Sequence, residues 1–130
     1  KKTKKNNTMI VGHGVDILEK VRFNNLFDKY KKKLIAKCFL YDEINENDVV
    51  SLSNNFSAKE AFSKALGLGF RYPSYPNLII IKRSHLGKPI ITLRDELHKY
   101  VIEKYPNYAI HLSISDTKSL SISSVIIEQI

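Results

Sequence analysis

The sequence has a single cysteine, no long apolar run and no apolar leader near its start. With Cys38 alone no intrachain disulfide can form, so we expect a buried structural thiol in a reducing compartment. No apolar stretch reaches the ~18 residues that a membrane-spanning helix needs. Residues 1–8 are basic and polar with no apolar stretch behind them, which does not fit a secretory signal. These absences predict a soluble intracellular protein with no membrane partner.

The sequence also lacks the short motifs of several enzyme classes. It contains no Walker phosphate loop, no dinucleotide-binding fingerprint and no G-x-S-x-G nucleophile elbow. The histidines show no zinc-ligand spacing backed by cysteines; they are His13, His85, His98 and His111. The sequence therefore does not indicate a P-loop hydrolase, a Rossmann dehydrogenase, an α/β-hydrolase or a zinc site.

Length and composition favour one folded domain with an anionic partner. The chain has 130 residues, of which 43% are hydrophobic, and this is enough for the core of a single domain. We predict a domain over residues 9–130, preceded by a basic tail or processing remnant over residues 1–8. The formal net charge of +8 favours a nucleic acid, a phosphorylated cofactor or an acidic protein as partner. Charge alone does not choose among these three.

Hydrophobic periodicity predicts an α+β fold with a mainly antiparallel sheet and packed helices. The strongest helix spans residues 49–66 and stops at Gly67, a residue that readily ends a helix in the left-handed conformation. Apolar stripes predict two further helices over residues 26–34 and 97–101, and the polar residues 42–48 suggest a turn that leads into the long helix. Strands are expected at 10–17, 78–81, 90–93, 109–115 and 120–127. The last four strands form two hairpins, and hairpins among helices are typical of α+β domains.

Three side chains are candidates for chemistry, and each also has a plain structural interpretation. Glu60 and Lys64 are four residues apart on the long helix, so they share a face. They fit a metal-binding carboxylate beside a phosphate-binding ammonium, but also a surface ion pair, or a capping box of Ser57 with Glu60. Asp16 fits a second metal ligand or a capping box with Glu19. Mg²⁺ needs only one or two carboxylates, but spacing alone does not establish that Asp16 and Glu60 meet.

Four segments form an ordered set of motifs. Residues 14–17 read G-V-D-I, and residues 56–67 read F-S-A-K-E-A-F-S-K-A-L-G, a pattern that is long and specific. Residues 87–89 read G-K-P, and residues 111–118 read H-L-S-I-S-D-T-K. Together these segments closely resemble the signature sequences of the holo-acyl-carrier-protein synthase family, and the likeness covers residues 9–128.

The resemblance implies the 4'-phosphopantetheinyl transferase fold and a magnesium-dependent reaction. Such enzymes move the 4'-phosphopantetheine arm of coenzyme A onto a serine of an acyl carrier protein, in fatty acid synthesis, and release adenosine 3',5'-bisphosphate. Asp16 and Glu60 would bind Mg²⁺, and Lys64 would touch the pyrophosphate of coenzyme A. A metal-bound water, Glu60 or His111 would accept the serine proton. The residues that would bind the coenzyme are Lys64, Gly67, Gly87, Lys88, Pro89, His111 and Ser113.

The resemblance also implies an assembly and a protein partner. The family works as a homotrimer with active sites between neighbouring subunits, in a bacterial-type cytoplasm or an organelle such as the plastid. Members of the family bind the acidic carrier protein through basic residues near their first helix. The residues expected to form the docking surface are Arg22, Phe23, Leu26, Lys29 and Lys37.

The chain departs from the family pattern at three places. Asn55 stands where an arginine commonly precedes the phenylalanine of the long motif. Residues 46–48, Glu-Asn-Asp, stand where basic residues are frequent, and Asp116 replaces a histidine. These changes leave open how the 3'-phosphate of coenzyme A is held, but they do not affect the expected metal ligands.

A basic nucleic-acid-binding module is the alternative from another functional class. The positive charge favours it, and Tyr72 and Tyr75 could stack on bases. However, the sequence has no RNP-type or helix-turn-helix signature. We therefore expect coenzyme A and an acyl carrier protein as partners, and no nucleic acid.

Overall fold

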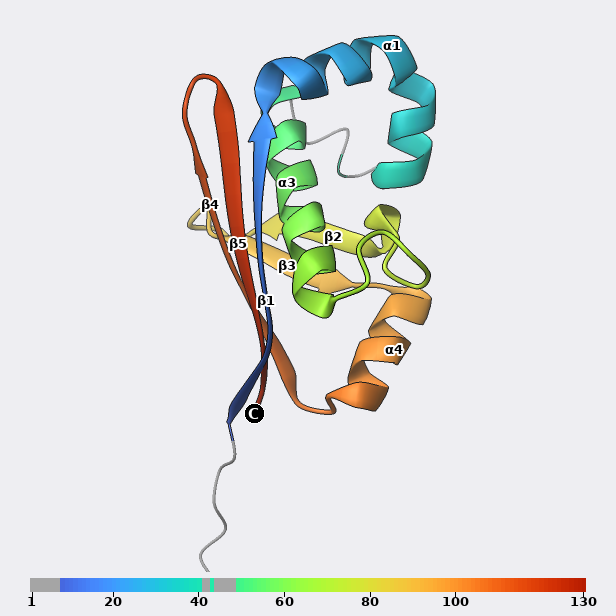
Figure 1. Ribbon diagram of the computed structural model, residues 1–130, viewed down its shortest axis with the longest axis vertical. Helices are drawn as coiled ribbons and strands as arrows, with labels where there is room; N and C mark the ends of the chain where they lie inside the picture. The colour runs from blue at the N-terminus through green and yellow to red at the C-terminus, as the bar shows by residue number, and fades with distance from the viewer. Residues whose placement is uncertain (1–7, 41–42, 44–48) are drawn as a thin grey trace, which may run out of the picture.

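The chain folds into a three-stranded sheet with helices on one side and a two-stranded ribbon beside it (Figure 1). This computed structural model describes residues 8–40, 43 and 49–130. The elements in chain order are β1 (Met9–Glu19), α1 (Lys20–Cys38), α3 (Val49–Leu66), the 3₁₀ turn η1 (Pro76–Leu78), β2 (Ile79–Arg83), β3 (Pro89–Leu93), α4 (Asp95–Lys104), β4 (Tyr108–Asp116) and β5 (Leu120–Gln129). The predicted α+β fold and its two hairpins are confirmed, whereas residues 42–48, apart from Glu43, lie outside the described residues.

Both sheets are antiparallel, and the larger one joins the two ends of the fold. Its strand order is β1–β5–β4, so β1 and β4 are the edges and β5 is central. The first strand pairs with the last from Met9 opposite Gln129 to Glu19 opposite Leu120. β2 and β3 form a separate ribbon, in which Arg83 lies opposite Pro89 beside the connecting turn.

Helix α3 is the centre of the main hydrophobic core. It packs across one face of the three-stranded sheet, where Ala61, Phe62 and Ala65 join residues of the strands and of α4 in one buried cluster. As predicted, the helix ends at Gly67, whose φ is 88°. The N–H groups of Gly67 and Leu68 donate to the Ser63 carbonyl at 3.1 and 3.2 Å, which satisfies the last turn.

Helix α1 follows β1 without a loop, and this corrects one expectation. β1 continues to Glu19, whose side chain makes no capping hydrogen bond. Asp16 therefore lies inside the strand, and the capping box of Asp16 with Glu19 was wrong. The capping box of Ser57 with Glu60 was also wrong, because Ser57 lies well inside α3. α1 bends where Tyr30 leaves helical geometry, at φ −123° and ψ 30°.

A second buried cluster joins α1 to the first half of α3. Its members are Phe23, Phe27, Cys38, Phe39 and Leu52. Cys38 is the buried free thiol that the sequence predicted, and burial raises its pKa.

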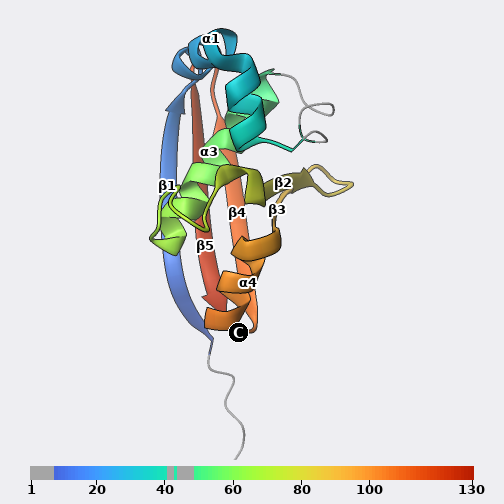
Figure 2. The same ribbon diagram turned by 90° about the vertical axis from the view of Figure 1, so that its right-hand side faces the viewer.

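The face of the sheet that points away from the helices is partly apolar. Figure 2 shows α3 and α4 on the same side of the strands. On the other side Val15, Ile17 and Ile122 are 45%, 63% and 39% exposed. Among the residues that the structure describes, no helix is long and apolar enough to cross a membrane.

Candidate active site

Two glycines of β1 allow α3 to approach the strand closely. A Cβ atom on Gly14 would lie 2.0 Å from the Ala61 carbonyl oxygen, and one on Gly12 would lie 2.0 Å from the Ala65 carbonyl oxygen. Any side chain at these positions would push the helix away from the strand. Because the two backbones touch here, Asp16, which lies two residues after Gly14 and on the same face of β1, faces α3 directly.

Asp16 is the buried acidic group at this contact. It is 5% exposed, and its Oδ1 accepts a hydrogen bond from Lys64 Nζ at 3.1 Å. Lys64 also donates to the Val15 carbonyl at 3.2 Å. Asp16 Oδ2 is buried and has no hydrogen-bond partner among the described residues. A buried carboxylate oxygen without a partner is costly, so this atom is suited to a bound cation.

Glu60 supplies the second carboxylate from α3. Burial raises its pKa, the charge of Asp16 raises it further, and the charge of Lys64 opposes both effects. The two carboxylates thus repel each other, and a divalent cation between them would relieve the repulsion. Lys64 pairs with Asp16 through a 3.1 Å ion pair, so the interpretation of Glu60 and Lys64 as a plain surface pair is not supported.

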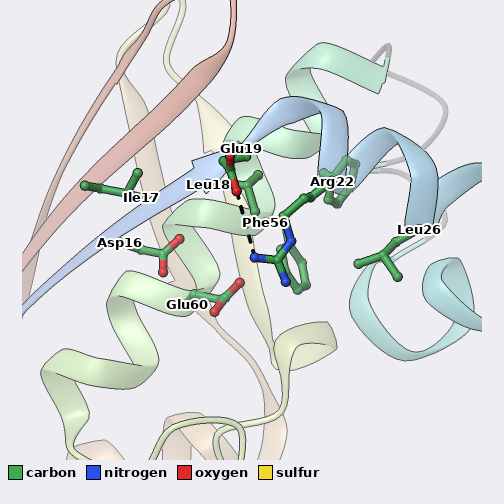
Figure 3. A pocket seen from close by; sticks show the side chains of 9 residues that line it. Asp16, Ile17, Leu18, Glu19, Arg22, Leu26, Phe56 and Glu60 are labelled. Carbon is green, nitrogen blue, oxygen red and sulfur yellow. Dashed lines mark ion pairs between the residues drawn. The ribbon is translucent and has the colours of Figure 1, made fainter.

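The carboxylates open into a groove between β1, α1 and α3 with a volume of about 460 Å³ (Figure 3). Arg22 and Leu26 of α1 lie on its rim; the Arg22 side chain is 80% exposed and its guanidinium lies 3.9 Å from Glu19. Phe23, 2% exposed, belongs to the core and lines the base of the groove. The remaining lining residues are Asp16, Ile17, Leu18, Glu19, Phe56 and Glu60.

The structure separates the other expected docking residues from this groove. Lys29 lies next to the bend of α1, with its ammonium 5.3 Å from the Tyr30 ring centroid. Lys37, near the end of α1, lines a different groove together with Phe70 and Tyr75. Only the N-terminal half of α1 therefore borders the carboxylates.

The residues expected at the nucleotide lie elsewhere on the same chain. His111 and Ser113 are exposed on β4, the edge strand opposite β1, and His111 Nε2 lies 2.8 Å from Glu128 Oε1. Asp16, by contrast, points toward α3. The turn that carries Gly87, Lys88 and Pro89 projects from the β2–β3 ribbon, and Figure 2 shows it on the other side of α3 from β1. Within one chain the structure does not bring these residues to Asp16 and Glu60.

Two charged contacts that shape the site were not predicted from the sequence. Lys59 is fully buried next to Glu60 and donates to Glu43 at 3.1 Å, to the Pro76 carbonyl at 2.8 Å and to the Ile79 carbonyl. Burial lowers the pKa of Lys59 to about 8, and Glu43 opposes that effect. The pair fixes α3 to the start of β2.

The second contact anchors the start of α1. Lys20 Nζ donates to Asp116 at 2.7 Å and to the Thr117 carbonyl at 2.6 Å. The hydrogen bond from Lys20, and a second one from Asn54, hold the pKa of Asp116 below its usual range. The first turn of α1, which carries Arg22, is thereby attached to the β4–β5 turn.

The match to known proteins covers almost the whole chain. A family model described as the 4'-phosphopantetheinyl transferase superfamily matches residues 12–116. The holo-acyl-carrier-protein synthase of Clostridium acetobutylicum is 40% identical over 92% of this chain and 98% of its own. The crystal structure of the holo-acyl-carrier-protein synthase from Neisseria meningitidis has a TM-score of 0.85 at 31% identity, over 92% of this chain and 98% of its own. The Helicobacter pylori enzyme, in complex with coenzyme A, has a TM-score of 0.77 at 28% identity, over 88% of this chain and 98% of its own.

Proposed function

The chain belongs to the holo-acyl-carrier-protein synthase family of the 4'-phosphopantetheinyl transferase superfamily, and we infer from this membership what it does. It transfers the 4'-phosphopantetheine arm of coenzyme A to a serine of apo acyl carrier protein. The observation that carries this conclusion in the structure is the pair of facing carboxylates, Asp16 and Glu60, beside the ammonium of Lys64. We also propose that residues 9–130 form the one transferase domain, because its first and last strands pair along their length.

Mass spectrometry of an apo acyl carrier protein tests the activity directly. Incubation with the chain, coenzyme A and Mg²⁺ should add the mass of one phosphopantetheine arm to the carrier. The same incubation with an excess of a chelator should leave the carrier unchanged. A carrier that gains no mass in the first incubation would contradict the assignment.

We propose Mg²⁺ as the metal of the site. Asp16 and Glu60 would hold it, and two carboxylates suit Mg²⁺, which completes its shell with water and substrate phosphates. No group of three or more histidine, cysteine or acidic residues is arranged to bind a metal within the described part of the chain. Bound there, Mg²⁺ would offset the negative charge that develops on the leaving group.

The reaction forms one bond at phosphorus and breaks another. The serine oxygen of the carrier bonds to the phosphorus next to pantetheine, the bond from that phosphorus to adenosine 3',5'-bisphosphate breaks, and the serine proton passes to a base. Lys64, held by Asp16, adds a positive charge beside the pyrophosphate. Of the side chains expected to act as base, Glu60 lines the groove, whereas His111 could reach it only from a neighbouring subunit.

We further propose a homotrimer whose active sites lie between subunits. One chain keeps Asp16 and Glu60 apart from the turn at residues 87–89, and a second copy would bring both groups to one coenzyme. The exposed apolar side chains on the free face of the sheet suit such a contact. We also propose that the enzyme acts in fatty acid synthesis, because its protein substrate is an acyl carrier protein.

Charge introduced on the free face of the sheet should break the trimer. Ile122→Lys should shift the mass measured by light scattering from three times the 14.9 kDa chain to a single chain, with loss of activity. Ile102→Lys on α4 is the matched control, since both isoleucines are 39% exposed. An Ile122→Lys variant that remains trimeric, or an active wild-type monomer, would contradict the proposed interface.

We propose that the carrier docks on the N-terminal half of α1. Arg22→Glu should raise KM for the carrier about tenfold, leave KM for coenzyme A unchanged and flatten the salt dependence of kcat/KM, because interface charges act mainly on association and are screened by salt. Lys99→Glu on α4 changes the net charge equally and should have little effect. Lys37→Glu tests whether docking extends past the bend at Tyr30. If Arg22→Glu instead weakens the binding of coenzyme A, the docking surface for the carrier lies elsewhere.

A further inference from the structure

Coenzyme A carries two separate anionic groups, and the groove accounts for one of them. The pyrophosphate is where Lys64 and the carboxylate pair are proposed to act. The other group is the phosphate on the 3' position of the ribose, which is a compact dianion near neutral pH. A site that selects coenzyme A needs a second cation for it. The arginine common in the family is absent, since Asn55 stands in its place.

The guanidinium of Arg83 lies beside Asn55. Arg83 is the last residue of β2, and its Nη2 donates to Asn55 Oδ1 at 3.1 Å. Burial lowers the pKa of Arg83. In the part of the chain that the structure describes, no carboxylate lies within ion-pair distance of this guanidinium. Among the described residues, the charge is therefore positioned without being neutralised.

Asn55 is well suited to hold a guanidinium for a ligand. It is 1% exposed and lies on α3, five residues before Glu60. Its amide oxygen fixes one edge of the guanidinium but carries no net charge. A guanidinium has five N–H donors, so the remaining donors stay available for a phosphate, which arginine can bind through two parallel hydrogen bonds.

The turn beside Arg83 is closed by hydrogen bonds and carries a second cation. Ser84 Oγ accepts hydrogen bonds from the Leu86 and Lys88 backbone at 3.3 and 3.1 Å, and the Ser84 N–H donates to the Lys88 carbonyl at 2.8 Å. Lys88 is exposed. Lys88 also belongs to the turn that the family resemblance places beside the nucleotide.

We propose that Arg83, positioned by Asn55, binds the 3'-phosphate of coenzyme A and makes the enzyme prefer coenzyme A over its 3'-dephospho form. This proposal rests on the proposed transferase function and adds a specificity determinant to it. Arg83 takes the role left open by the missing arginine, from a neighbouring strand rather than from α3. The acidic carrier protein could use the same charge, so the experiment must separate the two anions.

The test compares two donors that differ only in the 3'-phosphate. With wild-type enzyme, kcat/KM should be higher for coenzyme A than for 3'-dephospho-coenzyme A. Arg83→Gln should lower kcat/KM for coenzyme A by roughly 10- to 100-fold, the usual range for a lost hydrogen bond to a charged group, mainly through KM. The value for the dephospho donor and KM for the carrier should not change. Arg94→Gln, at the other end of the ribbon, is the matched control and should preserve the preference.

A near-isosteric change at Asn55 tests the positioning role. Asn55→Asp places a carboxylate against Arg83 and should neutralise it, so the preference for coenzyme A should fall as in Arg83→Gln. The double variant should lose no more than the single ones, because both changes remove the same interaction. Calorimetry should show the same pattern for adenosine 3',5'-bisphosphate, and no change for adenosine 5'-monophosphate, which lacks the 3'-phosphate.

Distinct outcomes separate this proposal from the transferase assignment. A wild-type enzyme that loads the carrier equally well from both donors would overturn the role of Arg83 and leave the activity intact. Equal losses for both donors in Arg83→Gln, or a raised KM for the carrier alone, would also overturn it. A wild-type chain that loads the carrier from neither donor would overturn the role of Arg83 together with the function.

Discussion

Glu60→Gln should lower kcat for arm transfer by about a thousandfold, which corresponds to ~4 kcal/mol in the barrier. The proposed magnesium site has only two protein carboxylates, and Asp16 already gives one oxygen to Lys64. The amide that replaces Glu60 is neutral and binds Mg²⁺ weakly, so the cation would no longer offset charge on the leaving group. Steady-state kinetics should show the loss, and calorimetry should show weaker Mg²⁺ binding.

The same substitution should not harm the fold. Burial and the charge of Asp16 both disfavour ionised Glu60, as its raised pKa indicates. Removing that charge should therefore leave the free energy of unfolding unchanged or slightly higher in the absence of metal. Glu103→Gln, on the exposed surface of α4, is the control for a lost carboxylate. Activity retained by Glu60→Gln at ordinary Mg²⁺ concentrations would refute the metal assignment.

Gly14→Ala should be the most damaging single-methyl substitution for the fold. The new Cβ would lie 2.0 Å from the Ala61 carbonyl oxygen and 2.6 Å from the Ala65 nitrogen, so α3 would have to move away from β1. Overpacking against a backbone that cannot rotate aside should cost about 3 kcal/mol or more. Denaturant unfolding at one fixed protein concentration measures this loss. Activity should fall as well, because Asp16 and Glu60 are carried by the two elements that separate.

Gly69→Ala is a control that separates steric overlap from backbone strain. Gly69 has a φ of 61° and nothing within 4 Å of the position of a Cβ atom. Alanine there should cost only the ~1–2 kcal/mol of the left-handed conformation. If Gly14→Ala destabilises the protein no more than Gly69→Ala, the close contact of α3 with β1 does not have the importance that we assign to it.

The elements that the sequence predicted are those with local signals. The long helix and its end at Gly67 follow from residues within one segment, and both hairpins follow from two adjacent apolar runs. The facing of Asp16 and Glu60 was anticipated only through the family resemblance. Its physical cause is the pair of glycines on β1, which let α3 approach the strand. Hydrophobic periodicity alone indicates only a strand weakened by glycines at these positions, and does not predict a contact with a helix.

The contacts that were missed join residues that are distant in the sequence. Lys59 meets Glu43 across 16 residues, and Lys20 meets Asp116 across 96. No pattern within a single segment encodes such pairs, because the fold itself brings them together. Lys59 in particular reads as a solvent-facing lysine in a helical sequence, although its side chain is fully buried.

Helix α3 has almost no surface of its own. Over residues 51–66 only Lys64 is exposed, because the sheet, α1 and the β2–β3 ribbon surround the helix. An ordinary surface helix has a solvated face on which substitutions accumulate freely. Evolution therefore conserves residues only at the buried positions, which recur every third or fourth residue. Helix α3 has no such solvated face on which neutral substitutions could accumulate. We therefore expect relatives to conserve this helix as one continuous segment of sequence. A saturation mutagenesis scan should find that consecutive positions do not tolerate substitution, with no helical period in the pattern.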